Sequence, residues 1–139
     1  MCGITQIRVR YSETDQMGLA YHGNYLAWME VGRTDMFRDL GIPYKAFEEQ
    51  GVMLPLVEMG CKFKRPIFYD DIVTIKTEVT YLSPVKISFS YVLSTDKPVA
   101  EGFTTHAFVN PQGKPINTAK KNPDLWAWME SHFLIRDES

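Results

Sequence analysis

A long stretch of helical periodicity, followed by several short alternating stretches, most constrains how this chain can fold. Between residues 24 and 40, apolar side chains recur at spacings of three and four, which is typical of an amphipathic helix. Asn24 is a suitable N-cap, and Gly41 before Ile42 and Pro43 predicts the helix end. The broad apolar side of this helix comprises Tyr25, Trp28, Met29, Gly32, Met36 and Leu40.

Five segments alternate apolar and polar residues, which predicts β-strands. They span residues 6–11, 57–63, 73–81, 87–93 and 99–110. A short helical piece over residues 44–50 and a last helix opened by Asn122 and Pro123 complete the predicted elements. Short connections favour antiparallel neighbours, and loops alone do not bury an apolar helix. We therefore predict one α+β domain over residues 1–139, in which a curled antiparallel β-sheet of about five strands wraps around one long helix.

Gly32 lies on the apolar side of the predicted helix, where glycine disfavours the helical conformation by about 1 kcal/mol relative to alanine. A close approach of the backbone to the wrapping sheet would offset that cost. The sequence therefore favours a close approach of the helix backbone to the sheet at Gly32.

Composition excludes several classes of partner. The net charge is −2 and the isoelectric point is near 5.9, so the basic excess that nucleic-acid binding needs is missing. No apolar run approaches the roughly 20 residues of a membrane-spanning helix, and we expect no signal peptide. The two cysteines, Cys2 and Cys61, fit no metal or redox motif, which favours a reduced, cytoplasmic setting. No histidine–carboxylate set has metal-ligand spacing, so we expect no metal.

The segment between the first strand and the long helix carries the residues that suggest chemistry. An acidic turn with Asp15 and Gly18 precedes the helix start near Asn24. We expect a carboxylate there to lie beside backbone N–H groups that have no partner within the helix. A carboxylate can attack a carbonyl or deprotonate water, and free amides can hold a developing oxyanion, which suggests acyl transfer. An aspartate that only caps the amides of its own turn is the alternative interpretation.

The motif in and after this segment comprises Tyr11, Asp15, Gly18, His22, Asn24, Tyr25, Leu26, Glu30 and Arg33. With the order of elements, it resembles the hot-dog-fold acyl-CoA thioesterases, in the branch of 4-hydroxybenzoyl-CoA thioesterase and YbgC-like proteins. The resemblance implies a hot-dog fold and hydrolysis of an acyl-CoA thioester. It implies that Asp15 is the catalytic carboxylate, as nucleophile or general base, and that the backbone N–H of His22 donates to the oxyanion. Tyr11 and His22 match positions that YbgC-like members share, whereas Gly23 stands where those members typically carry Ala or Ser.

Further residues are candidates for catalysis or for substrate contacts. The amides of His22 and Gly23 are the candidate oxyanion donors. Candidates for contacts to the acyl group and to the phosphates of coenzyme A are Asn24, Tyr25, Trp28, Met29, Lys62, Lys64 and Arg65. Each has a structural alternative, since residues of a helix stripe are usually core and basic residues on an edge strand deter strand pairing. Weaker candidates are Lys86, Lys120 and Lys121, and His106 and His132 have no evident partner.

Glu30 is a rival catalytic base, because some relatives in the wider fold place their carboxylate on the long helix. Arg33 lies three residues further on, at a spacing that allows an ion pair. We expect the structural ion pair rather than the catalytic role.

Two other functions stay open. A hot-dog enoyl-thioester hydratase or dehydratase would use His22 and Asp15 as acid and base, and a non-catalytic acyl-thioester-binding protein would release no thiol. All three take a small-molecule acyl-CoA, with coenzyme A as part of the ligand and no bound cofactor. The family closes the edges of its open sheets by pairing protomers, so the resemblance also implies a homodimer or homotetramer.

Overall fold

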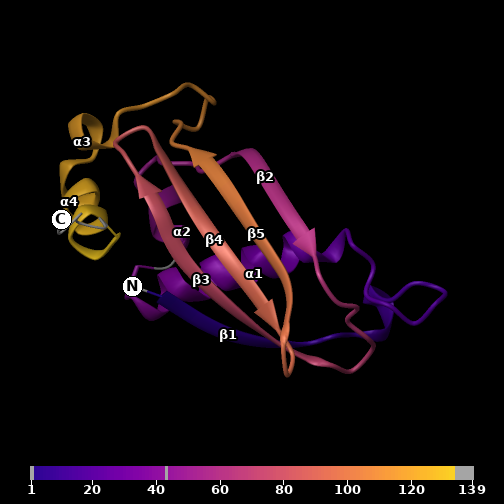
Figure 1. Ribbon diagram of the computed structural model, residues 1–139. Coiled ribbons are helices and arrows are strands. Elements are labelled where there is room, and N and C mark those ends of the chain that lie inside the picture. The colour runs from indigo at the N-terminus through magenta and orange to yellow at the C-terminus, as the bar shows by residue number, and fades with distance from the viewer. Residues whose placement is uncertain (1, 43, 134–139) are drawn as a thin grey trace.

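A five-stranded antiparallel sheet in the order β1-β3-β4-β5-β2 curls around the long helix α1 (Figure 1). This computed structural model describes residues 2–42 and 44–133 of the chain. The strands are β1 (Cys2–Arg8), β2 (Leu56–Phe63), β3 (Ile72–Leu82), β4 (Lys86–Ser94) and β5 (Pro98–Ala107). The helices are a 3-10 turn η1 (Tyr11–Glu13), α1 (Asn24–Asp39), α2 (Tyr44–Glu49), α3 (Thr118–Lys121) and α4 (Pro123–Phe133). The predicted α+β architecture is confirmed, and the sheet stays open, with β1 and β2 as its edges.

The core lies between the concave face of the sheet and one side of α1. Alternate residues of the central strands β3 and β4 are buried, as their alternating pattern predicted. The helix buries the predicted stripe except Leu40, which is half-buried, and adds two residues to it; its buried residues are Tyr25, Trp28, Met29, Gly32, Arg33, Met36 and Phe37.

The backbone of α1 approaches the sheet closely at Gly32, as predicted. A Cβ atom at Gly32 would lie 2.6 Å from Oγ1 of Thr77 and 2.8 Å from Cγ2 of Ile75. Both neighbours belong to β3 and are fully buried, so neither has room to move away. The missing side chain lets the helix backbone lie directly against the sheet.

Some predicted boundaries were wrong at the N-terminal end of the chain. The first strand spans Cys2–Arg8 rather than residues 6–11, and Tyr11 lies in the 3-10 turn η1. Cys2 pairs with Glu78 of β3 as part of this strand. The prediction of Asn24 as N-cap was also wrong by one position, because Asn24 is the first residue of α1 and Gly23 precedes it.

The C-terminal end of α1 is closed by aromatic side chains. The ring of Phe37 lies edge-on against Phe47 of α2, Phe89 of β4 and Phe133 of α4, with centroids 5.1, 5.8 and 5.4 Å away. Figure 1 shows α3 and α4 together at this end of the molecule, far from the loop that precedes α1. Edge-to-face pairs add about 0.5–1.5 kcal/mol each to the burial of the rings. This end of the helix is therefore packed core.

Candidate functional site

The loop before α1 is organised around Asp15. Its backbone N–H donates to the carbonyl of Leu19 (2.8 Å), and its carbonyl accepts from Gly18 (3.0 Å). Oδ1 of its carboxylate accepts from the amides of Met17 (2.8 Å) and Leu19 (3.2 Å). Gly18 has a φ of +77°, a conformation that glycine adopts without strain. Asp15 thus caps its own turn with one oxygen, while Oδ2 accepts no hydrogen bond from the described residues and the side chain is exposed.

The start of α1 presents two backbone N–H groups without an acceptor. The amide of Asn24 donates to the carbonyl of Tyr21 (3.0 Å), and that of Tyr25 donates to the carbonyl of His22 (3.2 Å). Within the described parts of the chain, the amides of His22 and Gly23 donate to no protein group. Such free donors at a helix start, with the positive end of the helix dipole, favour a developing negative charge.

The side chain of Asn24 ties the helix start to the preceding turn. Its Nδ2 donates to the carbonyls of Glu13 (2.8 Å) and Tyr21 (3.1 Å). An N-cap side chain accepts a hydrogen bond from the helix, whereas Asn24 donates two to the loop. This difference explains why Asn24 is the first helical residue rather than the cap.

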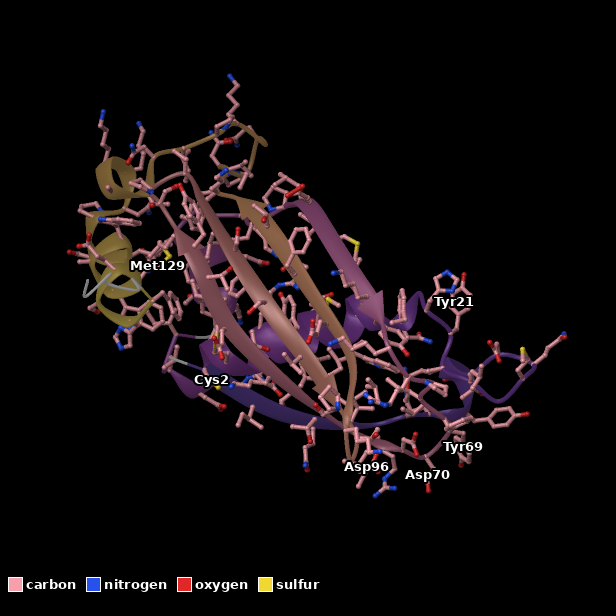
Figure 2. The ribbon with its side chains drawn as sticks, viewed as in Figure 1. Cys2, Tyr21, Tyr69, Asp70, Asp96 and Met129 are labelled. Carbon is pink, nitrogen blue, oxygen red and sulfur yellow. The ribbon has the colours of Figure 1, made fainter. Side chains whose placement is uncertain are left out.

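His22 lies at the surface, tilted against the ring of Tyr21 with centroids 4.4 Å apart. Among the described residues, the side chain of His22 makes no hydrogen bond to Asp15. A Cβ at Gly23 would lie 2.6 Å from Cε2 of Tyr21, which gives a packing reason for the glycine at this position. Figure 2 labels Tyr21 at the end of the molecule opposite Met129 of α4.

Tyr11 points to solvent at the edge of the loop. Its ring is 78% exposed and meets Tyr69 edge-on, with centroids 5.7 Å apart. Its hydroxyl makes no hydrogen bond to Asp15 or to another described residue. The structure therefore places the aspartate and the helix start on one loop, while Tyr11 stands apart from both.

A groove of about 310 Å³ opens at the start of α1. It is lined by Leu19, Ala20, His22, Tyr25, Phe63, Lys64, Arg65, Pro66 and Ile67. The rings of Tyr25 and Phe63 meet edge-on at 4.8 Å on its floor. The groove thus combines apolar and aromatic surface with cationic side chains, the pattern expected for a ligand site. Asp15 is outside its lining, and the aspartate turn is connected to it through Leu19, which hydrogen-bonds Asp15, and Ala20, which pairs with Thr14.

The remaining predicted contact residues of α1 are core. Trp28 is 3% exposed and stacks obliquely on Tyr25 with centroids 5.0 Å apart. Met29 is fully buried beneath β5, where a Cβ at Gly102 would lie 2.3 Å from its Cε. Of these three, only Tyr25 reaches the groove.

The predicted basic cluster is partly paired. Nζ of Lys64 lies 2.7 Å from Oε1 of Glu101, and the guanidinium of Arg65 donates to the carbonyl of Pro98. The hydrogen bond and charge of Lys64, with a smaller contribution from Lys62, lower the pKa of Glu101. Lys62 is exposed opposite Glu101 on β5. Lys64 and Arg65 therefore line the groove, while Lys62 lies on the strand that leads to it.

The predicted ion pair between Glu30 and Arg33 was wrong. Glu30 lies on the exposed outer side of α1, whereas Arg33 is 9% exposed and points into the sheet. There, Nη1 of Arg33 lies 3.4 Å from the hydroxyl of Tyr91, and its Nε has no partner among the described residues. The two side chains lie three residues apart on the helix, but only Arg33 faces the sheet, where its partner, the hydroxyl of Tyr91, is also hydrogen-bonded to Oγ1 of Thr104 (2.6 Å).

The prediction that His106 has no evident partner was also wrong, because its ring has two partners in the core. Its Nδ1 lies 3.1 Å from the carbonyl of Leu54 and its Nε2 lies 2.9 Å from Oγ1 of Thr104. Burial, together with the nearby charge of Arg33, lowers its pKa from 6.5 to about 4. His106 is thus a neutral core histidine next to a buried arginine. The carbonyl of Leu54 belongs to a residue fifty-two positions away, so no local pattern reveals this contact.

Glu13 is a residue of the loop that sequence reasoning missed. It is 8% exposed, and its carboxylate accepts from Nε1 of Trp28 (2.8 Å) and from the backbone N–H of Arg10 (2.7 Å). Burial acts to raise its pKa, but these hydrogen bonds and the charge of Arg10 outweigh burial and leave the pKa lowered. Its main partner is fifteen residues away, so no local pattern reveals the contact.

Comparisons with known proteins identify the family of the chain. The sequence profile of the thioesterase-like superfamily matches residues 9–129. The chain is 38% identical over 124 residues to the candidate acyl-CoA thioesterase YneP of Bacillus subtilis, covering 86% of this chain and 88% of the relative. It is 31% identical over 84 residues to the acyl-CoA thioester hydrolase YbgC of Escherichia coli, covering 60% and 63%.

A solved structure extends the likeness to the whole fold. The crystal structure of a DHNA-CoA thioesterase from Staphylococcus aureus superimposes with a TM-score of 0.88 at 33% identity, covering 94% of this chain and 89% of that chain. The chain therefore belongs to the thioesterase-like superfamily and has the hot-dog fold. Within the described residues, no helix is long and apolar enough to cross a membrane.

Proposed function

We propose that this protein hydrolyses an acyl-CoA thioester to a carboxylic acid and free coenzyme A. Asp15 acts as nucleophile or general base, and the amides of His22 and Gly23 hold the oxyanion. A thiol ionises near pH ~8.5, so it leaves without a strong general acid, and one carboxylate suffices. Coenzyme A enters as part of the substrate, and the reaction requires no bound cofactor or metal.

One observation carries this proposal above the others. The loop that holds Asp15 continues directly into a helix start with two unoccupied amide donors, next to a groove of apolar and cationic side chains. Because Oδ1 of Asp15 is engaged by its turn, Oδ2 is the oxygen available to a thioester carbonyl or to water. The relatives named as acyl-CoA thioesterases support the same chemistry.

The basic residues suggest how the coenzyme is held. Lys64 and Arg65 line the groove, with Lys62 beside them on β2, and charge-assisted hydrogen bonds from such groups suit phosphates. Tyr25 and Phe63 offer aromatic surface for the acyl group or the pantetheine arm. Coenzyme A esters belong to the reduced cell interior, in keeping with two free cysteines, so we propose a cytoplasmic location.

We further propose a homodimer, or a tetramer built from dimers, that pairs through β2. This edge strand exposes Val57, Met59 and Phe63, and an uncovered apolar edge favours pairing with a second copy. Phe63 also lines the groove, so pairing would bring the active site to the protomer boundary. Light scattering at micromolar concentration should give at least twice the 16.0 kDa chain mass. A monomer would contradict the assembly.

The Asp15→Asn variant tests the reaction. It keeps the acceptor oxygen for the turn amides, so the fold should persist, while loss of a positioned base or nucleophile lowers kcat by about 100-fold or more. Thiol release over a panel of short aliphatic to aromatic acyl-CoAs measures the effect, with Asp124→Asn, an exposed aspartate of α4, as the matched control. Nearly normal turnover by Asp15→Asn would remove Asp15 from the mechanism. Water addition to an unsaturated acyl-CoA without thiol release would instead identify a hydratase.

A further inference from the structure

Glu13 is buried, whereas most of the residues next to it in the sequence are exposed. Its side chain is held on both oxygens, since Oε2 accepts from Nε1 of Trp28 (2.8 Å) and Oε1 accepts from the amide of Arg10 (2.7 Å). Nε of Arg10 lies 3.4 Å from the same oxygen. A buried glutamate without such partners would be costly, so these contacts define where it sits.

The main chain of Glu13 forms a second link to the helix start. Its carbonyl accepts from the backbone N–H of Tyr21 (2.8 Å) and from Nδ2 of Asn24 (2.8 Å). Trp28 lies four residues after Asn24, one turn further along the same side of α1. Glu13 therefore joins the loop to the first two turns of the helix through its carbonyl and its carboxylate together.

We propose that Glu13 is a positioning residue that sets the separation between the Asp15 carboxylate and the free amides of His22 and Gly23. Asp15 follows two residues after Glu13, and the two amides lie between Tyr21 and Asn24, which the carbonyl of Glu13 holds. A displacement of about 1 Å between reacting groups can cost about 100-fold in rate. This inference rests on the proposed function of the same site.

Glu13 acts through the other residues rather than on the substrate. Its side chain lines a different groove, of about 340 Å³, between β1 and α1, together with Ile7, Arg8, Arg10, Trp28 and Val31. It is not part of the lining of the groove at the helix start. A ligand in the groove at the helix start would contact Tyr25 and His22. Glu13 lies with Trp28 in the lining of the other groove.

The Glu13→Gln variant is a sharp test because both carboxylate oxygens accept from N–H donors. A glutamine amide group has one oxygen, so its NH₂ must face either the indole of Trp28 or the amide of Arg10, donor against donor. We expect kcat for thiol release to fall about 10–100-fold with KM changed less than about threefold. Glu130→Gln, an exposed glutamate of α4, is the matched control. Turnover by Glu13→Gln within twofold of wild type would overturn the inference.

An Asp15→Asn background separates positioning from a general structural defect. If Glu13 acts by placing Asp15, adding Glu13→Gln to Asp15→Asn should change the residual rate by less than about twofold. An equal loss in both backgrounds would refute the positioning role. If Glu13→Gln does not fold, Trp28→Phe removes the indole donor while keeping an aromatic ring at this position; a folded Trp28→Phe protein with unchanged kcat would also refute the positioning role. Failure of the proposed function looks different, because the wild-type protein would then release no thiol, or Asp15→Asn would retain its rate.

Discussion

The two ends of helix α1 are built in opposite ways. At the C-terminal end, Phe37 is enclosed by Phe47, Phe89 and Phe133 from three other elements. At the N-terminal end, the amides of His22 and Gly23 have no acceptor among the described residues, and the loop before them is exposed. One helix thus anchors the core at one end and leaves polar groups unsatisfied at the other. Figure 2 places these ends apart, with Met129 near the first and Tyr21 near the second.

The contrast shows which end of the helix is packed and which end leaves hydrogen-bond donors free. Burial of aromatic rings supplies the free energy that keeps α1 in place. That anchoring lets the opposite end keep free donors, which would otherwise be satisfied by capping side chains. Substitutions at the closed end should change unfolding, and substitutions at the open end should change turnover.

The largest effect on stability is expected at the closed end. Phe37→Ala should lower the free energy of unfolding by about 3–5 kcal/mol, because it removes a fully buried ring and leaves a cavity. Urea denaturation followed by circular dichroism measures the change. Asp15→Asn, at the open end, should differ from wild type by less than about 1 kcal/mol in the same assay. Similar losses for both variants would break the contrast between the ends.

The next largest effect on stability is expected from protonation of His106, which lies between the two ends of α1. Its pKa is lowered to about 4 in the folded protein, against 6.5 ordinarily, so the unfolded chain binds the proton more readily. Stability is therefore complete above pH 6.5 and declines as the pH falls toward 4, by at most about 3 kcal/mol. The protonated ring would face Arg33 from α1, the carbonyl of Leu54 and the ring of Phe89.

Unfolding free energies at pH 7 and pH 4.5 measure this dependence. His106→Gln keeps a polar side chain without a proton to gain, so its stability should change less over the same interval. A wild-type protein equally stable at both values would contradict a neutral buried His106.

Two glycines on or next to α1 should give the smallest effects. Gly32→Ala forces a Cβ against Thr77 and Ile75, and the overpacking cost of about 1–3 kcal/mol exceeds the roughly 1 kcal/mol of helix propensity gained, leaving a net loss of up to about 2 kcal/mol. Gly23→Ala meets only Tyr21, whose half-exposed ring can turn away, so the loss should be below about 0.5 kcal/mol. The denaturation midpoints of the two variants rank the sites. A larger loss at Gly23 would show that the open end is as tightly packed as the helix centre.

Local patterns predicted most of the fold. Periodicity located α1 and the last four strands, and Gly32 on the apolar stripe indicated a close approach to the sheet, which the structure places at β3. The start of the chain was placed wrongly because alternation in residues 6–11 continues through a 3-10 turn that only hydrogen bonds reveal. Asparagine is a residue type that often caps helices, which is why the sequence predicts Asn24 as the N-cap. In the structure its side chain instead donates hydrogen bonds to carbonyls of the loop.

The candidate site was predicted less completely than the fold. Spacing brought Asp15 and the helix start together on one loop, since both are local features. The contacts of Glu13 with Trp28 and of Arg33 with Tyr91 join residues fifteen and fifty-eight positions apart. Such pairs depend on how the helix sits in the sheet, and no single stretch of sequence encodes them.

The distribution of indole rings gives the protein its own optical reporters. Trp28 is hydrogen-bonded to a carboxylate near the loop, while Trp126 and Trp128 belong to α4 at the far end. Replacing the two α4 tryptophans by phenylalanine leaves a single emitter beside Glu13. With excitation that tyrosine does not absorb, its intensity and wavelength then follow opening of that one region, without labels.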